Sequence, residues 1–431
     1  VRIACVDKAC PLARSTGLIN HLGLKLFGQI PVQQPESPNG ALNDSVEGSQ
    51  KGTIMSISLL DIARQVDNPT SLGAAIDELL ADQPVSLLGL GEPTHGVAAF
   101  PSLRNELLAH LVGRGYRSVV LETDSFAASI VDDYVCGGNV LLDEVLATGF
   151  SHGFGALPSN RELVEWLRDH NSGRAPQDRV RFRGFDAPVE YSGAPSPRKA
   201  LESLIGCLPS TLLPDSIRDL DALIGDEADW TNPAAMYDAS ASIGRSDRVR
   251  QLRIMVDELA EIQIHSELAV PEADQVVRTA LGLLGYHEAM ATPGPDRMDK
   301  LLNVRAEMMA ENLLAIVAAE EDRGPTLVFA HNAHLLRGPV DGGWVSAGAL
   351  VGQELGSSYM FIATDANPDS RPGTLAGLLS DATARRALFS TRALLKVLPA
   401  TVEVGEPMLP GHLPLKPADL DRADAVLFLS D

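Results

Sequence analysis

Short apolar runs alternate along most of the chain with longer amphipathic segments. The runs are rich in Val, Ile, Leu and Phe, as expected of strands that are buried on both faces of a sheet. They cover Val85–Leu90, Ser118–Glu122, Arg179–Asp186, Thr326–Ala330, Tyr359–Asp365 and Ala425–Leu429. Helical periodicity occupies segments between them, as at 103–115 and 159–171. This alternation predicts an α/β fold with a mostly parallel central sheet flanked by helices.

Two stretches depart from this alternation. Residues 1–54 are rich in Pro, Gly, Ser, Asn and Gln and have no apolar period, so we expect a disordered tail before an α/β domain over 55–431. The first helix is predicted at 56–67. Residues 198–322 contain no convincing strand and read as a run of helices. We predict that they form a helical insertion, as a lid or a side lobe over the sheet.

Composition and charge exclude several classes of protein. Hydrophobic residues make up 45% of the 431 residues and charged residues 21%, a balance typical of soluble globular proteins. The formal net charge of −22 argues against partners such as nucleic acid and anionic membrane surfaces. No apolar stretch approaches the length of a spanning helix, and the segment Leu18–Val32 does not resemble a secretory signal. With only four cysteines, the sequence predicts a reducing, cytoplasmic compartment.

Titratable residues follow four of the predicted strands where each strand ends. Ligands bind at the carboxyl ends of the strands in open parallel sheets, so these side chains are expected to share one pocket. Any one of them, taken alone, is read more simply as a turn or cap residue. As a set they predict a functional cluster. Its members are Glu92, His95, Glu122, Asp186, His331 and His334.

The cluster has the residue types needed for general base catalysis. An imidazole that is oriented by one carboxylate keeps its second nitrogen free to take a proton from water, and His95 is the candidate base. Either Glu92 or Glu122 can be the orienting carboxylate. The histidines His331 and His334 could donate hydrogen bonds to a developing oxyanion or hold the water. Arg104 lies nine residues after His95 and could pair with one of the two glutamates or bind substrate.

Two other chemistries remain open at this point. The same histidines and glutamates could bind a metal or haem, although the sequence has no HExxH or CxxC spacing. The segment Gly149–Gly153 satisfies the G-x-S-x-G pattern of serine hydrolases, with Ser151 as the nucleophile. That pattern needs a strand before the serine and a helix after it. Here a helical segment precedes Ser151, which disfavours this alternative.

Several motifs together resemble the erythromycin esterase family. They are GEPTHG at 91–96 with Arg104 after it, a strand ending at Glu122, WLRDHN at 166–171, RGFD at 183–186, NVRAEMMAENL at 303–313 and FAHNAHL at 329–335. Their order and spacing are similar to those of the family. The resemblance covers about 85–430.

The resemblance implies a metal-independent hydrolase that opens the lactone ring of macrolide antibiotics. It places His95 as the base, with Glu92, Arg104, Glu122 and His331 as further catalytic residues. It also implies substrate-binding positions at His334 and Arg305, where the family often has Arg-Asp and this chain has Arg305-Ala306.

From the residues and the resemblance together, we predict an α/β esterase of EC class 3.1.1 that confers macrolide resistance. Asp186 joins His334 and Arg305 as a substrate-binding residue. The predicted partner is a small-molecule ester or macrolide, and no cofactor is expected. The oligomeric state stays open. A lactonase or esterase acting on another substrate, a serine hydrolase using Ser151, and a metal-binding protein of the same fold are the alternatives.

Overall fold

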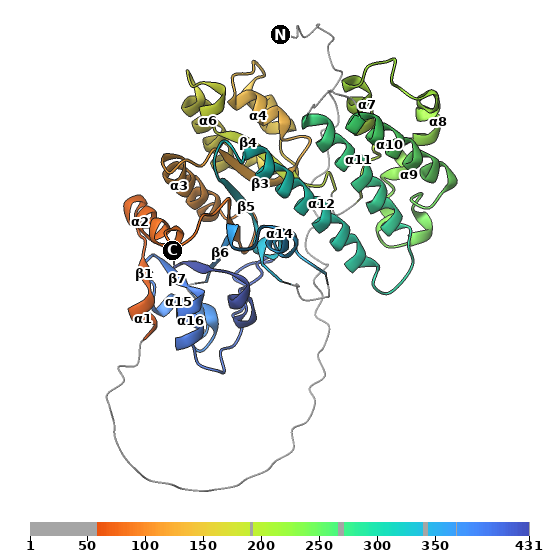
Figure 1. Ribbon diagram of the computed structural model, residues 1–431. Coiled ribbons are helices and arrows are strands. Elements are labelled where there is room, and N and C mark those ends of the chain that lie inside the picture. The colour runs from red at the N-terminus through yellow and green to blue at the C-terminus, as the bar shows by residue number, and fades with distance from the viewer. Residues whose placement is uncertain (1–57, 190–192, 266–270, 339–343, 368, 431) are drawn as a thin grey trace, which may run out of the picture. The chain divides into compact units, whose positions relative to one another are not determined.

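The computed structural model describes residues 58–430 except 190–192, 266–270, 339–343 and 368 (Figure 1). The tail that the sequence predicts to be disordered, residues 1–54, lies outside the described residues. No helix in the described part of the chain has both the length and the apolar character needed to cross a bilayer.

The described residues form an eight-stranded sheet in the order β1-β7-β8-β6-β2-β5-β3-β4. The strands are β1 (Arg64–Gln65), β2 (Leu87–Glu92), β3 (Ser118–Asp124), β4 (Arg181–Asp186), β5 (Thr326–His331), β6 (Tyr359–Ala366), β7 (Arg386–Ser390) and β8 (Ala425–Leu429). The pairings from β8 to β4 are parallel, whereas β7 pairs antiparallel with β8 and with β1. The predicted mostly parallel sheet is therefore confirmed, with an antiparallel edge that the sequence did not indicate.

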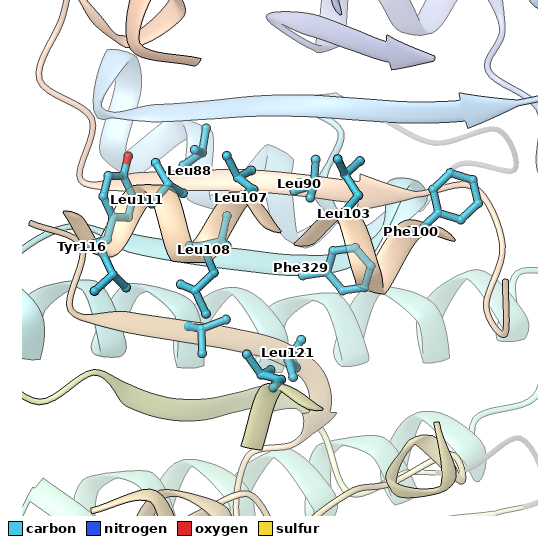
Figure 2. Close-up of a cluster of buried hydrophobic side chains, with 14 of the residues drawn as sticks. Leu88, Leu90, Phe100, Leu103, Leu107, Leu108, Leu111, Tyr116, Leu121 and Phe329 are labelled. Atoms are coloured by element: carbon cyan, nitrogen blue, oxygen red, sulfur yellow. The ribbon is translucent and has the colours of Figure 1, made fainter. Parts of the chain in front are cut away.

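Successive side chains of each strand point to opposite faces of the sheet. Both faces are apolar here, so helices cover both of them. One layer consists of α2 (Pro69–Leu80), α3 (Ala99–Gly113), α4 (Ser129–Val135), α5 (Leu142–Thr148) and α6 (Pro158–Asn171). The other consists of α12 (Arg297–Glu320), α13 (Asn332–Leu335), α14 (Ala347–Leu355), α15 (Leu375–Asp381) and α16 (Thr391–Val397). In Figure 2, Leu103 and Leu107 of α3 lie against Leu88 and Leu90 of β2. Leu87, the residue before Leu88, belongs to the core on the opposite face.

The segment from 198 onward is helical, as predicted. It contains α7 (Arg198–Cys207), α8 (Leu220–Ile224), α9 (Glu227–Trp230), α10 (Asp247–His265) and α11 (Pro271–Met290), which share a hydrophobic core of their own around Trp230. The helix α12 belongs to both parts. Leu301 and Met308 pack with the helical segment, whereas Met309 and Leu313 pack on the sheet. The second half of α12 is thus part of the central domain, although the sequence assigned it to the insertion.

The predicted helix at 56–67 is wrong in most of its length. The helix α1 covers only Leu59–Ile62, and the chain is already extended at Ala63. The next two residues form β1, which pairs with Ala387 and Leu388 of β7. Pairing with the sheet edge therefore overrides the local helical pattern.

Short 3-10 helices complete the described structure. They are η1 (Phe154–Ala156), η2 (Pro176–Asp178), η3 (Asp215–Asp219), η4 (Pro233–Met236), η5 (Ala239–Ala241), η6 (Gly356–Ser358) and η7 (Pro417–Arg422). Of these, η1 follows directly after the Gly149–Gly153 segment and places Phe154 beside the site described next.

Candidate active site

The sheet order brings the predicted cluster together. Strands β2, β5, β3 and β4 are neighbours, and all four run in the same direction. Glu92 at the end of β2 is in register with His331 at the end of β5. Glu122 lies near the end of β3, where the register with β4 shifts before Asp186. Glu92 and His331, which are 239 positions apart along the chain, therefore share one edge of the sheet.

His95 lies between two carboxylates on the loop after β2. Its Nδ1 atom is 2.7 Å from Glu92 Oε1, and its Nε2 atom is 3.7 Å from Glu122 Oε1. In the neutral ring the Nδ1–H group donates to Glu92, which leaves the Nε2 lone pair free to accept a proton. The side chain is 33% exposed, so water and substrate can reach it. Glu92 is therefore the carboxylate that contacts the imidazole, and Glu122 faces its other nitrogen.

The electrostatics favour a proton on this histidine. Burial alone would lower the pKa of His95, but the carboxylates of Glu122 and Glu92 raise it above the ordinary imidazole value. Burial raises the pKa of Glu92, and the charge of Glu122 adds to that effect. The two groups thus hold a proton between them more tightly than either would in water.

Glu122 is held ionised by donors on both of its oxygens. Its Oε2 atom accepts the backbone N–H of His331 at 2.8 Å. Its Oε1 atom is 3.3 Å from Arg305 Nη2 and 3.3 Å from His334 Nε2. Burial would raise the pKa of Glu122, but the neighbouring His334, His95 and Arg305 hold it well below its usual value. Glu122 is therefore a fixed negative charge rather than a proton acceptor.

Arg305 connects Glu122 to Asp186. Its guanidinium on α12 contacts Asp186 through Nε at 2.9 Å and through Nη2 at 2.6 Å. Burial would raise the pKa of Asp186, but Arg305 and a hydrogen bond from His152 lower it to about 2. Residue 306, where the family often has Asp, is a buried alanine here. The carboxylate partners of Arg305 come instead from the ends of β3 and β4.

His331 does not fit the predicted oxyanion-binding role. Its Nε2–H group donates to the Pro93 carbonyl at 3.0 Å, and its Nδ1 atom accepts the Ala333 N–H at 3.1 Å. Both ring nitrogens are therefore used. Burial, with the charge of His95, lowers the pKa of His331 to about 3, so the ring stays neutral. Its role in this geometry is to cap α13 and to hold the loop that carries His95.

His334 keeps a nitrogen available. Its Nε2 atom faces Glu122, whereas its Nδ1 atom is buried and makes no hydrogen bond within the described structure. The ring lies edge-on to Trp344, with ring centroids 6.0 Å apart. Of the two predicted histidines on α13 and its N-terminus, His334 is therefore the one with a ring nitrogen that makes no hydrogen bond, and that nitrogen is closed off from solvent in this structure.

Arg104 is buried and does not pair with either glutamate. Its guanidinium donates to Asn105, to Asn160 Oδ1 at 2.9 Å and to the Ser159 carbonyl at 3.3 Å, and it lies over the Phe329 ring. Of the two options that the sequence left open, pairing with a glutamate and binding substrate, the first is not seen, because amide and carbonyl oxygens on α3 and α6 accept the hydrogen bonds of the guanidinium. Burial lowers the pKa of Arg104 to about 9, so it remains a cation at neutral pH.

Arg104 still belongs to the site through a shared cavity. The cavity has a volume of about 20 Å³, enough for one water molecule. Its polar lining groups are Glu92, Arg104, Glu122 and Asn160. Its other walls are apolar, with Phe150, Phe154 and Phe329 among them. The Arg104 guanidinium therefore lines this cavity together with both carboxylates.

Ser151 occupies a structural position. The helix α5 and a bend precede it, and a turn with η1 follows, so the strand–serine–helix context of a nucleophile is missing. Its hydroxyl accepts the Asp124 N–H at 3.0 Å and contacts Thr123 Oγ1 at 3.2 Å. The loop is thereby attached to the end of β3.

One histidine of the site was not predicted from the sequence. His152 directly follows Ser151, and its Nε2 atom is 2.9 Å from Asp186 Oδ2. The sequence signal was its place in the Gly149–Gly153 segment, which drew attention to the serine only.

Within the described residues, no group of three or more His, Cys, Asp or Glu side chains is arranged to hold a metal ion.

Comparison with known proteins agrees with the geometry. The sequence profile of the erythromycin esterase family matches residues 112–402, and the chain belongs to this family. A search of curated proteins finds no match.

Solved structures share the fold at low sequence identity. A Bacillus cereus protein has 19% identity and a TM-score of 0.65, and a succinoglycan biosynthesis protein has 13% identity and a TM-score of 0.65. A histidine-to-asparagine variant of the erythromycin esterase EreC, in an open conformation, has 18% identity and a TM-score of 0.61. Each alignment covers 86% of this chain and 95% of the other. At these identities the likeness concerns the fold, and the family assignment implies a hydrolase that acts on esters.

Proposed function

We propose that the protein hydrolyses lactone esters of the macrolide type, with water activated by His95. The observation that carries the proposal is the geometry of His95, whose Nδ1 is held by Glu92 while Nε2 stays exposed to the site. Family membership supports an ester substrate, and the EreC neighbour is an erythromycin esterase. The matching test is incubation of the purified protein with macrolides and simple esters, in which we expect acid release that can be titrated.

The proposed reaction proceeds by direct attack of water. His95 Nε2 takes a proton from water as the oxygen bonds to the ester carbonyl carbon, and the carbonyl electrons move to the oxygen. Arg305 and His334, whose nitrogens contact Glu122 beside His95, are the groups we propose to stabilise that negative charge. Collapse of the intermediate breaks the bond to the ring alkoxide, which takes the proton back from His95. The products are a carboxylic acid and an alcohol on one opened ring.

The helices α11 and α12 lie beside the site. The helix α12 carries Arg305 to the site, and Tyr286 of α11 is close enough for the charges of Arg305 and Asp186 to act on its pKa. We infer that this helical segment forms one wall, or a lid, for a macrolide ring. Opening the ring inactivates the antibiotic, so the proposed physiological role is macrolide resistance.

The pH dependence of the reaction follows from the charges around His95. Because Glu122 and Glu92 raise its pKa, kcat/KM is expected to rise with pH through a value above the ordinary imidazole pKa of about 6.5. In Glu122→Gln the negative charge opposite His95 Nε2 is lost, so the rise of kcat/KM with pH is expected to occur at lower pH. A matched control is Glu106→Gln, which removes a carboxylate paired with Arg386 instead. The expectation fails if both variants keep the wild-type pH profile.

Replacing Ser151 separates this mechanism from a serine hydrolase. In Ser151→Ala we expect kcat within about threefold of wild type and a loss of about 1 kcal/mol in unfolding free energy, since two hydrogen bonds of the loop disappear. A fluorophosphonate probe should leave the wild-type protein unlabelled. Complete loss of activity together with labelling at Ser151 would instead establish the serine mechanism.

A further inference from the structure

The Gly149–Gly153 segment is a loop with an unusual backbone. His152 has a φ angle of 56°, and it is the one residue other than glycine with positive φ among those that the structure describes. Gly153 follows with a φ angle of 73°. Residues with a Cβ atom are uncommon in this left-handed region, and Asn, Asp and His are enriched among those that adopt it. The backbone therefore accepts a histidine here, and the contacts of its ring decide what it does.

The loop is fixed at the residue before. The Ser151 N–H donates to Thr123 Oγ1 at 2.7 Å, and the Ser151 hydroxyl accepts the Asp124 N–H at 3.0 Å. Because these contacts attach the loop to the end of β3, the backbone position of His152, the left-handed residue that follows, is fixed. Strain that persists in an otherwise well-anchored loop is often associated with function.

The imidazole of His152 reaches the charged network of the site. Its Nε2 atom lies 2.9 Å from Asp186 Oδ2, and the side chain is 12% exposed. Asp186 in turn accepts two hydrogen bonds from Arg305, and Arg305 reaches Glu122. The Phe154 ring lies between the two histidines, with centroids 5.5 Å from His152 and 5.1 Å from His95.

We infer that His152 is a positioning residue for the proposed hydrolysis. Its ring fixes the Asp186 carboxylate, which fixes the Arg305 guanidinium against Glu122, the charge that faces the Nε2 atom of His95. His152 acts through these groups and takes no proton from the water itself. The inference rests on the proposed function, and it assigns a role to a histidine that the sequence pattern presents only as a neighbour of a serine.

The variant His152→Gly tests this directly, because glycine relieves the backbone while removing the ring. We expect the melting temperature to stay the same or rise, while kcat falls about 10- to 100-fold with KM little changed, as when catalytic groups are misplaced by about 1 Å. The matched control is His110→Asn. It removes another histidine–aspartate contact of 2.9 Å, between His110 in the last turn of α3 and Asp77. The control is expected to keep the wild-type kcat.

An NMR titration of His95 supplies a readout that does not need activity. Glu122 raises the pKa of His95, so in His152→Gly a displaced Glu122 carboxylate is expected to move the His95 titration to lower pH, whereas loss of a His152 charge alone would move it to higher pH. Two results would overturn the inference: wild-type kcat with a titration that does not move to lower pH, or a loss of kcat matched by a fall in melting temperature. If the wild-type protein cleaves no ester, the proposed function fails, and the titration still decides whether His152 acts on the network.

Discussion

Replacing His95 with alanine is expected to lower kcat about 10²- to 10⁴-fold, the usual contribution of a positioned general base. The reason is geometric. His95 is the ring whose Nε2 faces the site while Nδ1 is held by Glu92, and both ring nitrogens of His331 are already used. Steady-state hydrolysis of an ester that the wild type cleaves measures the effect. The fold should persist, since the His95 side chain is 33% exposed.

A matched control keeps this result specific. His170 is also partly exposed, and it stacks on Trp166 away from the predicted cluster. We expect His170→Ala to retain the wild-type kcat, and both variants to show the wild-type circular dichroism spectrum. A folded His95→Ala protein with wild-type kcat would remove His95 from the mechanism.

Replacing Arg305 with methionine is expected to give the largest loss of stability. Asp186 is fully buried and Glu122 nearly so, and both carboxylates rely on this guanidinium. Removing one partner of a buried ion pair costs about 3–5 kcal/mol in unfolding free energy, because the remaining charge is left uncompensated. Urea unfolding at pH 7 measures it. Arg305→Lys keeps the charge but loses the two-pronged contact, so we expect a smaller loss.

The stability loss in Arg305→Met should depend on pH in a defined direction. The pKa of Asp186 is about 2 in the folded protein, against about 3.9 for an unfolded aspartate. A lowered pKa contributes stability above the unfolded value, and this contribution disappears as the pH falls toward 2. The difference between wild type and Arg305→Met should therefore narrow below about pH 4. A difference that is constant from pH 7 to pH 3 would show that Asp186 is not the group that Arg305 stabilises.

The strands that hold the site were visible in the sequence because they are buried on both faces. The runs that begin at Ser118 and Thr326 coincide with the starts of β3 and β5. The two strands with antiparallel pairing that precede β8 in the sheet order gave weaker signals. Strand β1 has two residues, and β7 begins at the second residue of a polar Arg385–Arg386 pair, so neither carries an apolar run long enough to indicate a strand.

The contacts within the site could be predicted only in part. That strand-end residues share one edge follows from a parallel sheet, but the strand order that places Glu122 beside Asp186 cannot be obtained from local pattern. Two partners of Arg104, Asn160 and Ser159, come from α6, which no spacing in the sequence relates to α3. The sequence could not show that the ring of His331 caps α13, because that depends on the side-chain rotamer. It could not show the role of His152 either, because the partner of His152 is Asp186 on β4, far away in the sequence.

The most direct test of the proposed function is the mass of macrolides after incubation in water enriched in heavy oxygen. The purified wild-type protein is mixed with macrolides of several ring sizes and, in parallel, with simple esters. We expect at least one macrolide to gain the mass of one heavy water molecule, with the heavy oxygen in the new carboxylate, and His95→Ala to leave it unchanged. Macrolides that stay intact while simple esters are cleaved would contradict the macrolide substrate. Cleavage of neither would contradict the hydrolase itself.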